Sequence, residues 1–235
     1  MDALARLAEQ PERAAVLLDV DGALAPIVPR PEDARVPDET RDELRRLHGR
    51  YALVACISGR AGDDARRIVG VSELVYVGNH GLELEPDADA WAARLQEFLE
   101  DVHWPWLENK QLSAALHFRE AEDEQAAVAA LEDVAARARD AGFTTRFGRK
   151  VLELLPPLEA NKGTAVRQLL DERGLDRALY AGDDTTDLDA FAALDGLEVA
   201  VRVAVTSDEG PAGLRANADV TVASPAELLA LLRDL

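Results

Sequence analysis

The sequence predicts an α/β protein with a doubly wound, mostly parallel Rossmann-like sheet and an inserted α+β unit. Short apolar runs alternate with helical segments in the first third of the chain, as in successive strand–loop–helix units. This alternation stops near residue 84 and resumes near residue 160. We therefore expect a catalytic core made of residues 1–83 and 160–235, with a cap domain inserted at 84–159.

The first strong signal is the apolar run at 16–19, which ends abruptly on Asp19, Asp21 and Gly22. A run of this kind is typical of a central parallel strand that is covered on both faces. Two carboxylates this close repel each other unless a cation or a shared proton offsets the repulsion. Asp and Gly are also ordinary turn residues, so this stretch alone leaves a turn and a site equally open.

The other core elements follow from apolar periodicity and from helix start and stop signals. Asn161 is a good N-cap, Gly174 is a good helix stop, and Ser224 begins a capping box with proline at the first helical position. We expect a short helix or an arm at 2–13, helices at 37–48, 62–69, 162–172 and from 225 onward, and strands at 51–57, 74–77, 178–181, 197–204 and 219–222.

The inserted unit has a different pattern. Its first segment, 88–107, has the spacing of an amphipathic helix, and 112–119 alternates like a strand. An alanine-rich helix is expected at 121–141. Residues 143–147 and 150–155 are expected to form a β-hairpin around Gly148.

Composition narrows the class of protein. The formal net charge of −19 argues against binding to nucleic acid or anionic membranes, but it does not exclude a small phosphorylated substrate. The single cysteine, Cys56, rules out an intrachain disulfide framework and suits a reducing compartment. We see neither a signal peptide nor a membrane span, and we expect a cytoplasmic monomer.

Polar side chains recur where the expected core strands end or a helix begins. Each has an ordinary explanation: a turn at Ser58, a surface lysine at Lys162, and a helix N-terminal acidic cluster at Asp183 and Asp184. The carboxyl ends of parallel strands meet at one edge of a sheet, so these residues and Asp19 are expected to converge. Their ordered recurrence favours a site over four unrelated surface features.

The chemistry of these groups fits phosphoryl transfer. A carboxylate can attack phosphorus and form an acyl phosphate, and a second acid can protonate the leaving oxygen and then activate water. Mg²⁺ prefers carboxylate and carbonyl oxygens. A hydroxyl, a lysine and backbone N–H groups can hold the phosphate oxygens as charge develops.

Taken together, the four motifs resemble those of the haloacid-dehalogenase-like phosphatases. They are Asp19-Val20-Asp21-Gly22, Ser58, Lys162 and Gly182-Asp183-Asp184-x-x-Asp187. The resemblance implies that Asp19 is the nucleophile and Asp21 the general acid/base. It also implies that Ser58, Gly59 and Lys162 hold the phosphoryl group, Lys162 being catalytic as well. Mg²⁺ would be held by Asp19, the Asp21 carbonyl, Asp183 and Asp184, with Asp187 supporting them.

The long gap between Ser58 and Lys162 places the cap between the second and third motifs, an arrangement that disfavours a sugar phosphomutase. Within it, Lys110-x-x-Ser113-x-x-x-His117-Phe118-Arg119 and Gly148-x-Lys150-Val151-Leu152-Glu153 are similar to signatures of the trehalose-6-phosphate phosphatase family, as is Gly78-Asn79-His80-Gly81 in the core. That resemblance implies sugar-hydroxyl contacts from the following residues: Asn79, Glu108, Lys110, Arg119, Arg149 and Glu153.

Three positions depart from the family pattern: Ala23 replaces Thr, Phe118 replaces Tyr, and Leu155 replaces Arg before Pro156. The resemblance implies a Mg²⁺-dependent phosphatase that acts on trehalose 6-phosphate. Two alternatives remain open. One is a phosphatase for another sugar phosphate, such as sucrose, mannosylglycerate or pseudo-disaccharide phosphate. The other is a weakly active or non-catalytic sugar-phosphate-binding homologue.

Overall fold

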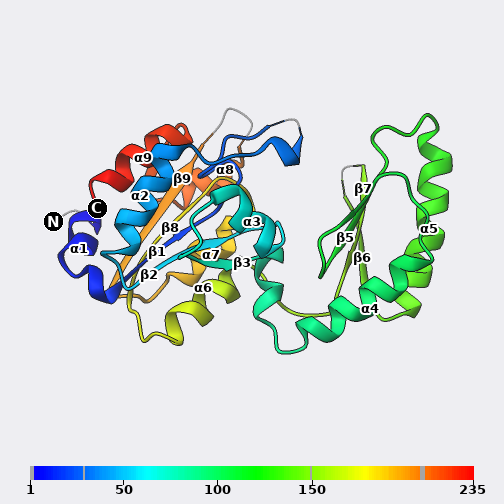
Figure 1. Ribbon diagram of the computed structural model, residues 1–235, viewed down its shortest axis with the longest axis horizontal. Coiled ribbons are helices and arrows are strands. Elements are labelled where there is room, and N and C mark those ends of the chain that lie inside the picture. The colour runs from blue at the N-terminus through cyan, green and yellow to red at the C-terminus, as the bar shows by residue number, and fades with distance from the viewer. Residues whose placement is uncertain (1–2, 29, 149, 207–209) are drawn as a thin grey trace. The chain divides into compact units, whose positions relative to one another are not determined.

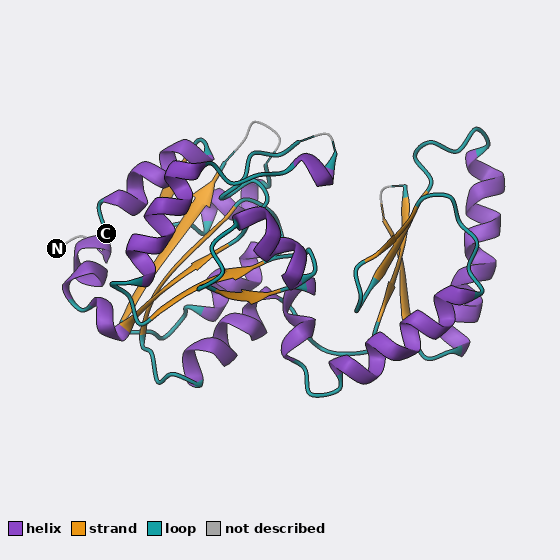
Figure 2. Ribbon diagram, viewed as in Figure 1, coloured by secondary structure: helices purple, strands orange, loops and turns teal. Residues whose placement is uncertain are grey.

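The computed structural model describes residues 3–28, 30–148, 150–206 and 210–235 (Figure 1). The chain divides into two compact units, Met1–Gly81 together with Ala160–Leu235, and Leu82–Glu159. The first contains a six-stranded parallel sheet and the second a four-stranded antiparallel sheet (Figure 2). The predicted fold class is therefore confirmed. The roles of the two units as catalytic core and cap stay a prediction.

The parallel sheet has the strand order β10-β9-β8-β1-β2-β3, with β1 near its centre. Every residue of β1 and β2 is buried, as the apolar runs in the sequence predict. The strands are β1 Ala14–Leu18, β2 Leu53–Ile57, β3 Val75–Val77, β8 Arg177–Gly182, β9 Val199–Val205 and β10 Val220–Val222.

Helices cover both faces of this sheet, which makes the unit doubly wound (Figure 1). On one face lie α1 Ala3–Glu9, α2 Asp38–His48, α3 Gly62–Val69 and α9 Pro225–Arg233, which share one apolar core with the strands. On the other face lie α6 Lys162–Asp171 and α7 Asp187–Ala193, and α8 Ala212–Ala216 contacts α7. Short 3₁₀ segments occur at η1 Pro11–Arg13, η2 Pro31–Asp33 and η3 Asn79–Leu84.

The second unit is an antiparallel sheet backed by two helices. The strand order is β4-β5-β7-β6, and α4 Ala88–Glu100 and α5 Glu124–Asp140 pack on one sheet face through a core that includes Leu95, Leu116 and Leu131. The strands are β4 Leu107–Asn109, β5 Ala114–His117, β6 Thr144–Gly148 and β7 Val151–Leu155. The predicted hairpin is therefore present, with Lys150 at its turn in the left-handed region.

The prediction of one helix over 88–107 is wrong. The helix ends at Glu100, and a short strand, β4, begins at Leu107. Pro105 explains the break, because proline lacks the N–H that a helix interior needs and disfavours helical geometry in the residue before it. The side chain of Trp104, the residue before Pro105, donates its indole N–H to the carbonyl of His117 at 2.7 Å.

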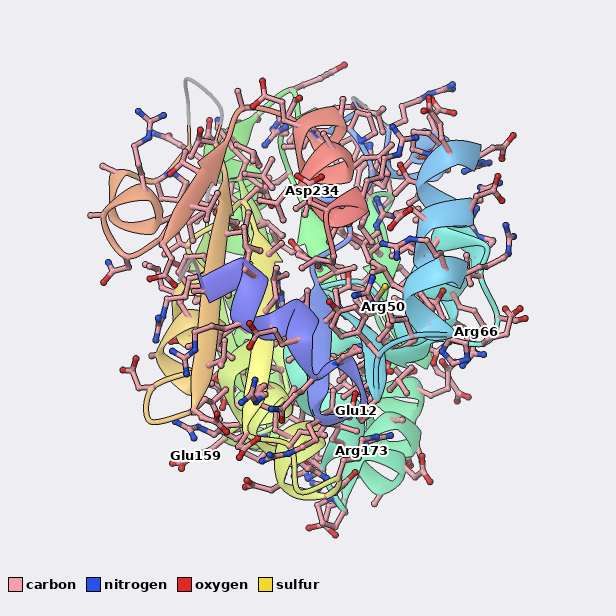
Figure 3. All side chains as sticks on the ribbon, turned by 90° about the vertical axis from the view of Figure 1, so that its left-hand side faces the viewer. Glu12, Arg50, Arg66, Glu159, Arg173 and Asp234 are labelled. Atoms are coloured by element: carbon pink, nitrogen blue, oxygen red, sulfur yellow. The ribbon has the colours of Figure 1, made fainter. Side chains whose placement is uncertain are left out.

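Carboxylates and guanidinium groups are spread over the outer surface of the protein (Figure 3). Many of them form pairs one helical turn apart, such as Arg45 with Asp42 at 2.8 Å. Pairs of this kind on an exposed surface contribute little to stability, about 0.3–0.5 kcal/mol each. Among the described residues, no helix combines the length and apolar character that crossing a bilayer requires.

Candidate active site

The carboxyl ends of β1, β2 and β8 lie side by side, because these strands are neighbours in the parallel sheet. Leu18 pairs with Cys56 of β2 and with Ala181 of β8, so the residues that follow each strand emerge at one edge. The N–H of Asp19 donates to the Ala181 carbonyl at 2.8 Å, and Ser58 follows β2 as a buried residue. The topology thus brings the first two sequence motifs together.

Lys162, the third motif, connects the first motif with the fourth. It is the first residue of α6, which is fixed by a capping box between Asn161 and Thr164. Its Nζ lies 3.0 Å from Asp19 Oδ2 and 2.7 Å from Asp187 Oδ1, and its side chain is only 2% exposed. Burial by itself lowers the pKa of Lys162, but the attraction of the two carboxylates outweighs this effect and raises it. The ammonium group is therefore a fixed positive charge beside Asp19.

Asp187 holds together the loop at residues 183–186, which we call the acidic loop. Its Oδ1 accepts from Lys162 and from the hydroxyl of Tyr180, each at 2.7 Å. Its Oδ2 accepts from the backbone N–H groups of Asp183 and Asp184, each at 2.9 Å. With both oxygens engaged twice, this fully buried carboxylate supports the loop, as the sequence resemblance implies, and has little capacity left to bind a ligand.

Crowding of the acids raises their pKa values. Burial, reinforced by the charges of Asp187 and Asp183, raises the pKa of Asp19 well above its usual range, while Lys162 acts in the opposite direction. Burial together with Asp187 raises the pKa of Asp183 to about 7. In the absence of a cation, both carboxyl groups therefore favour their protonated form more than an exposed aspartate does.

The carboxylates of Asp19, Asp183 and Asp187 have oxygens within 4.8 Å of one another, a group that could hold a metal ion. A divalent cation would take the place of the proton that crowding favours, and an all-oxygen donor set suits Mg²⁺. Because Asp187 is already saturated with hydrogen bonds, Asp19 and Asp183 are the better ligands. Asp184 is exposed and lies outside this group, so its predicted metal contact stays a prediction.

Asp21 lies two residues after Asp19 but has a different partner, Arg60. Arg60 donates from Nε to Asp21 Oδ2 at 2.6 Å and from Nη2 to Oδ1 at 2.8 Å. The sequence reasoning missed Arg60 and also missed Tyr180, the partner of Asp187. Position in the chain gave a signal for both, since Arg60 follows Ser58 and Gly59 directly, and Tyr180 lies in the strand that ends in the acidic motif.

Gly59 and Asn79 belong to two segments that meet beside Ser58. The backbone N–H of Asn79 donates to the Arg60 carbonyl at 2.7 Å, and that of His80 donates to the Ser58 carbonyl at 2.9 Å. A Cβ at Gly59 would lie 2.6 Å from the His80 ring, so a larger residue at this position would require that ring to move. The structure therefore places the predicted core residue Asn79 next to the Ser58–Gly59 turn.

Gly22 allows the acidic loops to approach each other. It has a φ of +78°, and a Cβ there would lie 2.0 Å from Asp183 Oδ2. We expect Gly22→Ala to displace the Asp183 carboxylate and to lower the turnover that the sequence resemblance implies about a hundredfold, the scale of an ångström-sized misplacement.

Gly174→Ala is the matched control for this substitution. Gly174 also has a positive φ, +61°, but has nothing within 4 Å of the added Cβ. Both substitutions carry a backbone cost of about 1–2 kcal/mol, measurable by urea denaturation, whereas only Gly22→Ala should impair turnover. Equal turnover in the two variants would contradict the proposed role of Gly22.

The second unit presents most of the predicted sugar-binding residues. Glu108 Oε2 lies 3.1 Å from His117 Nε2 and 3.8 Å from Lys110 Nζ. Glu153 forms an ion pair of 2.6 Å with Arg146, its cross-strand neighbour. Arg119 is exposed, and Arg149 lies outside the described residues.

The parallel sheet, the acids at its carboxyl edge and the inserted α+β unit define a haloacid-dehalogenase-like hydrolase fold. A solved haloacid dehalogenase-like hydrolase from Bacteroides thetaiotaomicron superposes with a TM-score of 0.62 at 14% identity, covering 95% of this chain and 100% of that one. At that identity the likeness shows the fold alone.

Within this class, the chain belongs to the trehalose-phosphatase family, whose model matches residues 17–224. A probable trehalose-phosphate phosphatase 9 from Oryza sativa subsp. japonica is 32% identical over an alignment of 226 residues, gaps included, that covers 78% of this chain. The chain spans only 60% of that curated relative's length. A solved trehalose-6-phosphate phosphatase related protein has a TM-score of 0.73 at 25% identity, covering 94% of this chain and 96% of that one. The family resemblance seen in the sequence is confirmed.

Proposed function

We propose that the protein is a Mg²⁺-dependent phosphatase that hydrolyses trehalose 6-phosphate to trehalose and phosphate through an aspartyl-phosphate intermediate. The observation that carries this proposal is the buried Asp19 carboxylate, which lies 3.0 Å from the Lys162 ammonium and within reach of the Asp183 carboxylate. Membership of the trehalose-phosphatase family and the names of the relatives support the choice of substrate.

Asp19, Asp183, Asp184 and the Asp21 carbonyl are the groups that would hold Mg²⁺. Once bound, the cation would offset charge on the phosphate and on the nucleophile. The raised pKa values of Asp19 and Asp183 fit this assignment, because a cation favours the carboxylate form that a nucleophile needs.

The chain's own groups complete two balanced steps. Asp19 forms a bond to phosphorus while the bond from phosphorus to the sugar oxygen breaks. The sugar oxygen keeps the electron pair of the broken bond and takes a proton from Asp21. Water then attacks phosphorus and gives one of its protons to Asp21. The bond between Asp19 and phosphorus breaks, and its electron pair returns to Asp19. Ser58, Gly59 and Lys162 would hold the other phosphate oxygens during both steps.

The family resemblance supports assigning recognition of the sugar to a set of polar side chains. A site that binds many hydroxyls needs side chains that both donate and accept hydrogen bonds. Glu108, Lys110, Arg119 and Glu153 supply such groups on the second unit, and Asn79 supplies one on the first. Arg149, outside the described residues, completes the predicted set.

Phosphate release from a panel of sugar phosphates tests the proposal. The panel contains trehalose 6-phosphate, sucrose 6-phosphate and a mannosylglycerate phosphate, each with Mg²⁺ and with a chelator. We expect trehalose 6-phosphate to have the highest kcat/KM, and the chelator to abolish release until Mg²⁺ is restored. Faster release from another sugar would overturn the substrate assignment. Tight binding without release would identify a non-catalytic homologue.

A further inference from the structure

Arg60 is held by Asp21 in the loop that follows β1, by Asp64 in α3 and, through its backbone N–H, by Ser58. Its guanidinium donates to both oxygens of Asp21, at 2.6 and 2.8 Å, and its third nitrogen donates to Asp64 Oδ2 at 2.9 Å. Its backbone N–H donates to the Ser58 hydroxyl at 3.2 Å. The side chain is only 16% exposed, so these contacts fix one orientation of the guanidinium.

The pair with Asp21 is a fork-to-fork contact, the geometry that planar guanidinium and carboxylate groups form best. Such a contact fixes the plane of the carboxylate as well as its distance. The Asp21 side chain is 39% exposed, so the contact with Arg60 restrains a carboxylate that is partly open to solvent. Asp19, by contrast, is buried and held by Lys162.

Asp64 anchors the guanidinium from the opposite side. It lies in the first turn of α3, and its other oxygen accepts from Arg67 at 2.5 and 3.1 Å. Hydrogen bonds to Asp21 raise the pKa of Arg60 more than burial lowers it, so the guanidinium stays charged. The contacts from Asp64 through Arg60 to Asp21 therefore connect α3 to the loop that follows β1.

We propose that Arg60 is the positioning residue for Asp21, orienting its carboxyl group toward the leaving oxygen of the phosphate ester. This inference rests on the proposed function, in which Asp21 is the general acid/base. A general acid contributes only when it lies within hydrogen-bond reach of the oxygen that it protonates. A residue that fixes the plane of the acid, without touching the substrate, controls whether that reach is achieved.

Dependence on the leaving group separates this role from a merely structural one. Phenolate is a poor leaving group and needs the proton from Asp21, whereas nitrophenolate leaves without it. Since kcat/KM reports the step in which the leaving group departs, loss of orientation should lower kcat/KM for phenyl phosphate and spare p-nitrophenyl phosphate. A disturbed fold or a disturbed phosphate site would lower both.

The experiment compares Arg60→Met, Arg60→Lys and Asp21→Asn on phenyl phosphate, p-nitrophenyl phosphate and trehalose 6-phosphate. We expect Arg60→Met to lower kcat/KM for phenyl phosphate and trehalose 6-phosphate about ten- to a hundredfold, and for p-nitrophenyl phosphate less than about threefold. Arg60→Lys, which keeps the charge but not the fork, should recover part of the loss. In the Asp21→Asn background, Arg60→Met should add almost nothing.

Arg67→Met is the matched control, because Arg67 also binds Asp64 but donates there rather than to Asp21. Arg67→Met should leave unchanged the ratio of kcat/KM for phenyl phosphate to kcat/KM for p-nitrophenyl phosphate. The role of Arg60 would be overturned if Arg60→Met lowered kcat/KM equally for both aryl phosphates or for neither. It would also be overturned if Arg60→Met lowered kcat/KM as much in the Asp21→Asn background as in the wild type. Failure of the wild type to release phosphate would instead refute the proposed function, and the inference with it.

Discussion

Asp19→Asn is expected to abolish phosphate release while leaving the fold intact. An amide oxygen is a far poorer nucleophile than a carboxylate, so we expect kcat to fall by at least about a thousandfold. Stability should change little, because the substitution loses the ion pair with Lys162 but also removes repulsion with Asp183 and Asp187. Steady-state phosphate release and urea denaturation measure the two effects separately.

Asp63→Asn serves as the control for this substitution, since Asp63 is an exposed acid in the first turn of α3. It should retain wild-type turnover. If the Asp19→Asn protein kept full activity, Asp19 would have no place in the mechanism. If it were inactive but also unfolded, Asp19→Ser, which lacks the charge and is smaller, would have to be folded and inactive for the assignment to hold.

Asp187→Ala is expected to have the largest effect on stability. The substitution leaves the Lys162 ammonium, the Tyr180 hydroxyl and two backbone N–H groups without their shared acceptor in a fully buried position. Removing one partner of a buried ion pair typically costs about 3–5 kcal/mol. Urea denaturation should show a loss of that size, together with loss of turnover.

Asp189→Ala provides the comparison, because Asp189 is an exposed acid on the same helix, α7. Its free energy of unfolding should stay within about 0.5 kcal/mol of the wild type. A loss of less than about 1 kcal/mol in Asp187→Ala would show that the buried network contributes little, and the argument that Asp187 supports the acidic loop would fail.

The fold was largely predictable because its signals are local. Apolar runs such as those of β1 and β2 are typical of buried parallel strands, and Asn161 and Ser224 mark helix starts that the structure shows as capped. The extent of the helix that begins at Ala88 was mispredicted, because apolar residues continue beyond Glu100 and the break at Pro105 was overlooked.

The site was predictable as far as its residues stand in recognisable motifs. The order of the acids, the serine and the lysine in the chain predicted their convergence, and the parallel sheet explains it physically. The contact of Arg60 with Asp21 was not predictable in this way, because it joins two loops and depends on the geometry of both. The same holds for the exposure of Asp184, which sequence spacing alone does not determine.

Chemical trapping at position 19 tests the central claim most directly. The protein, mixed with trehalose 6-phosphate and Mg²⁺, is quenched during turnover and reduced with borohydride, which converts an aspartyl phosphate to homoserine. Peptide mass spectrometry should then find homoserine in place of Asp19, and only in samples that contain substrate. Release of phosphate with Asp19 unmodified, or with the modification at another carboxylate, would contradict the account.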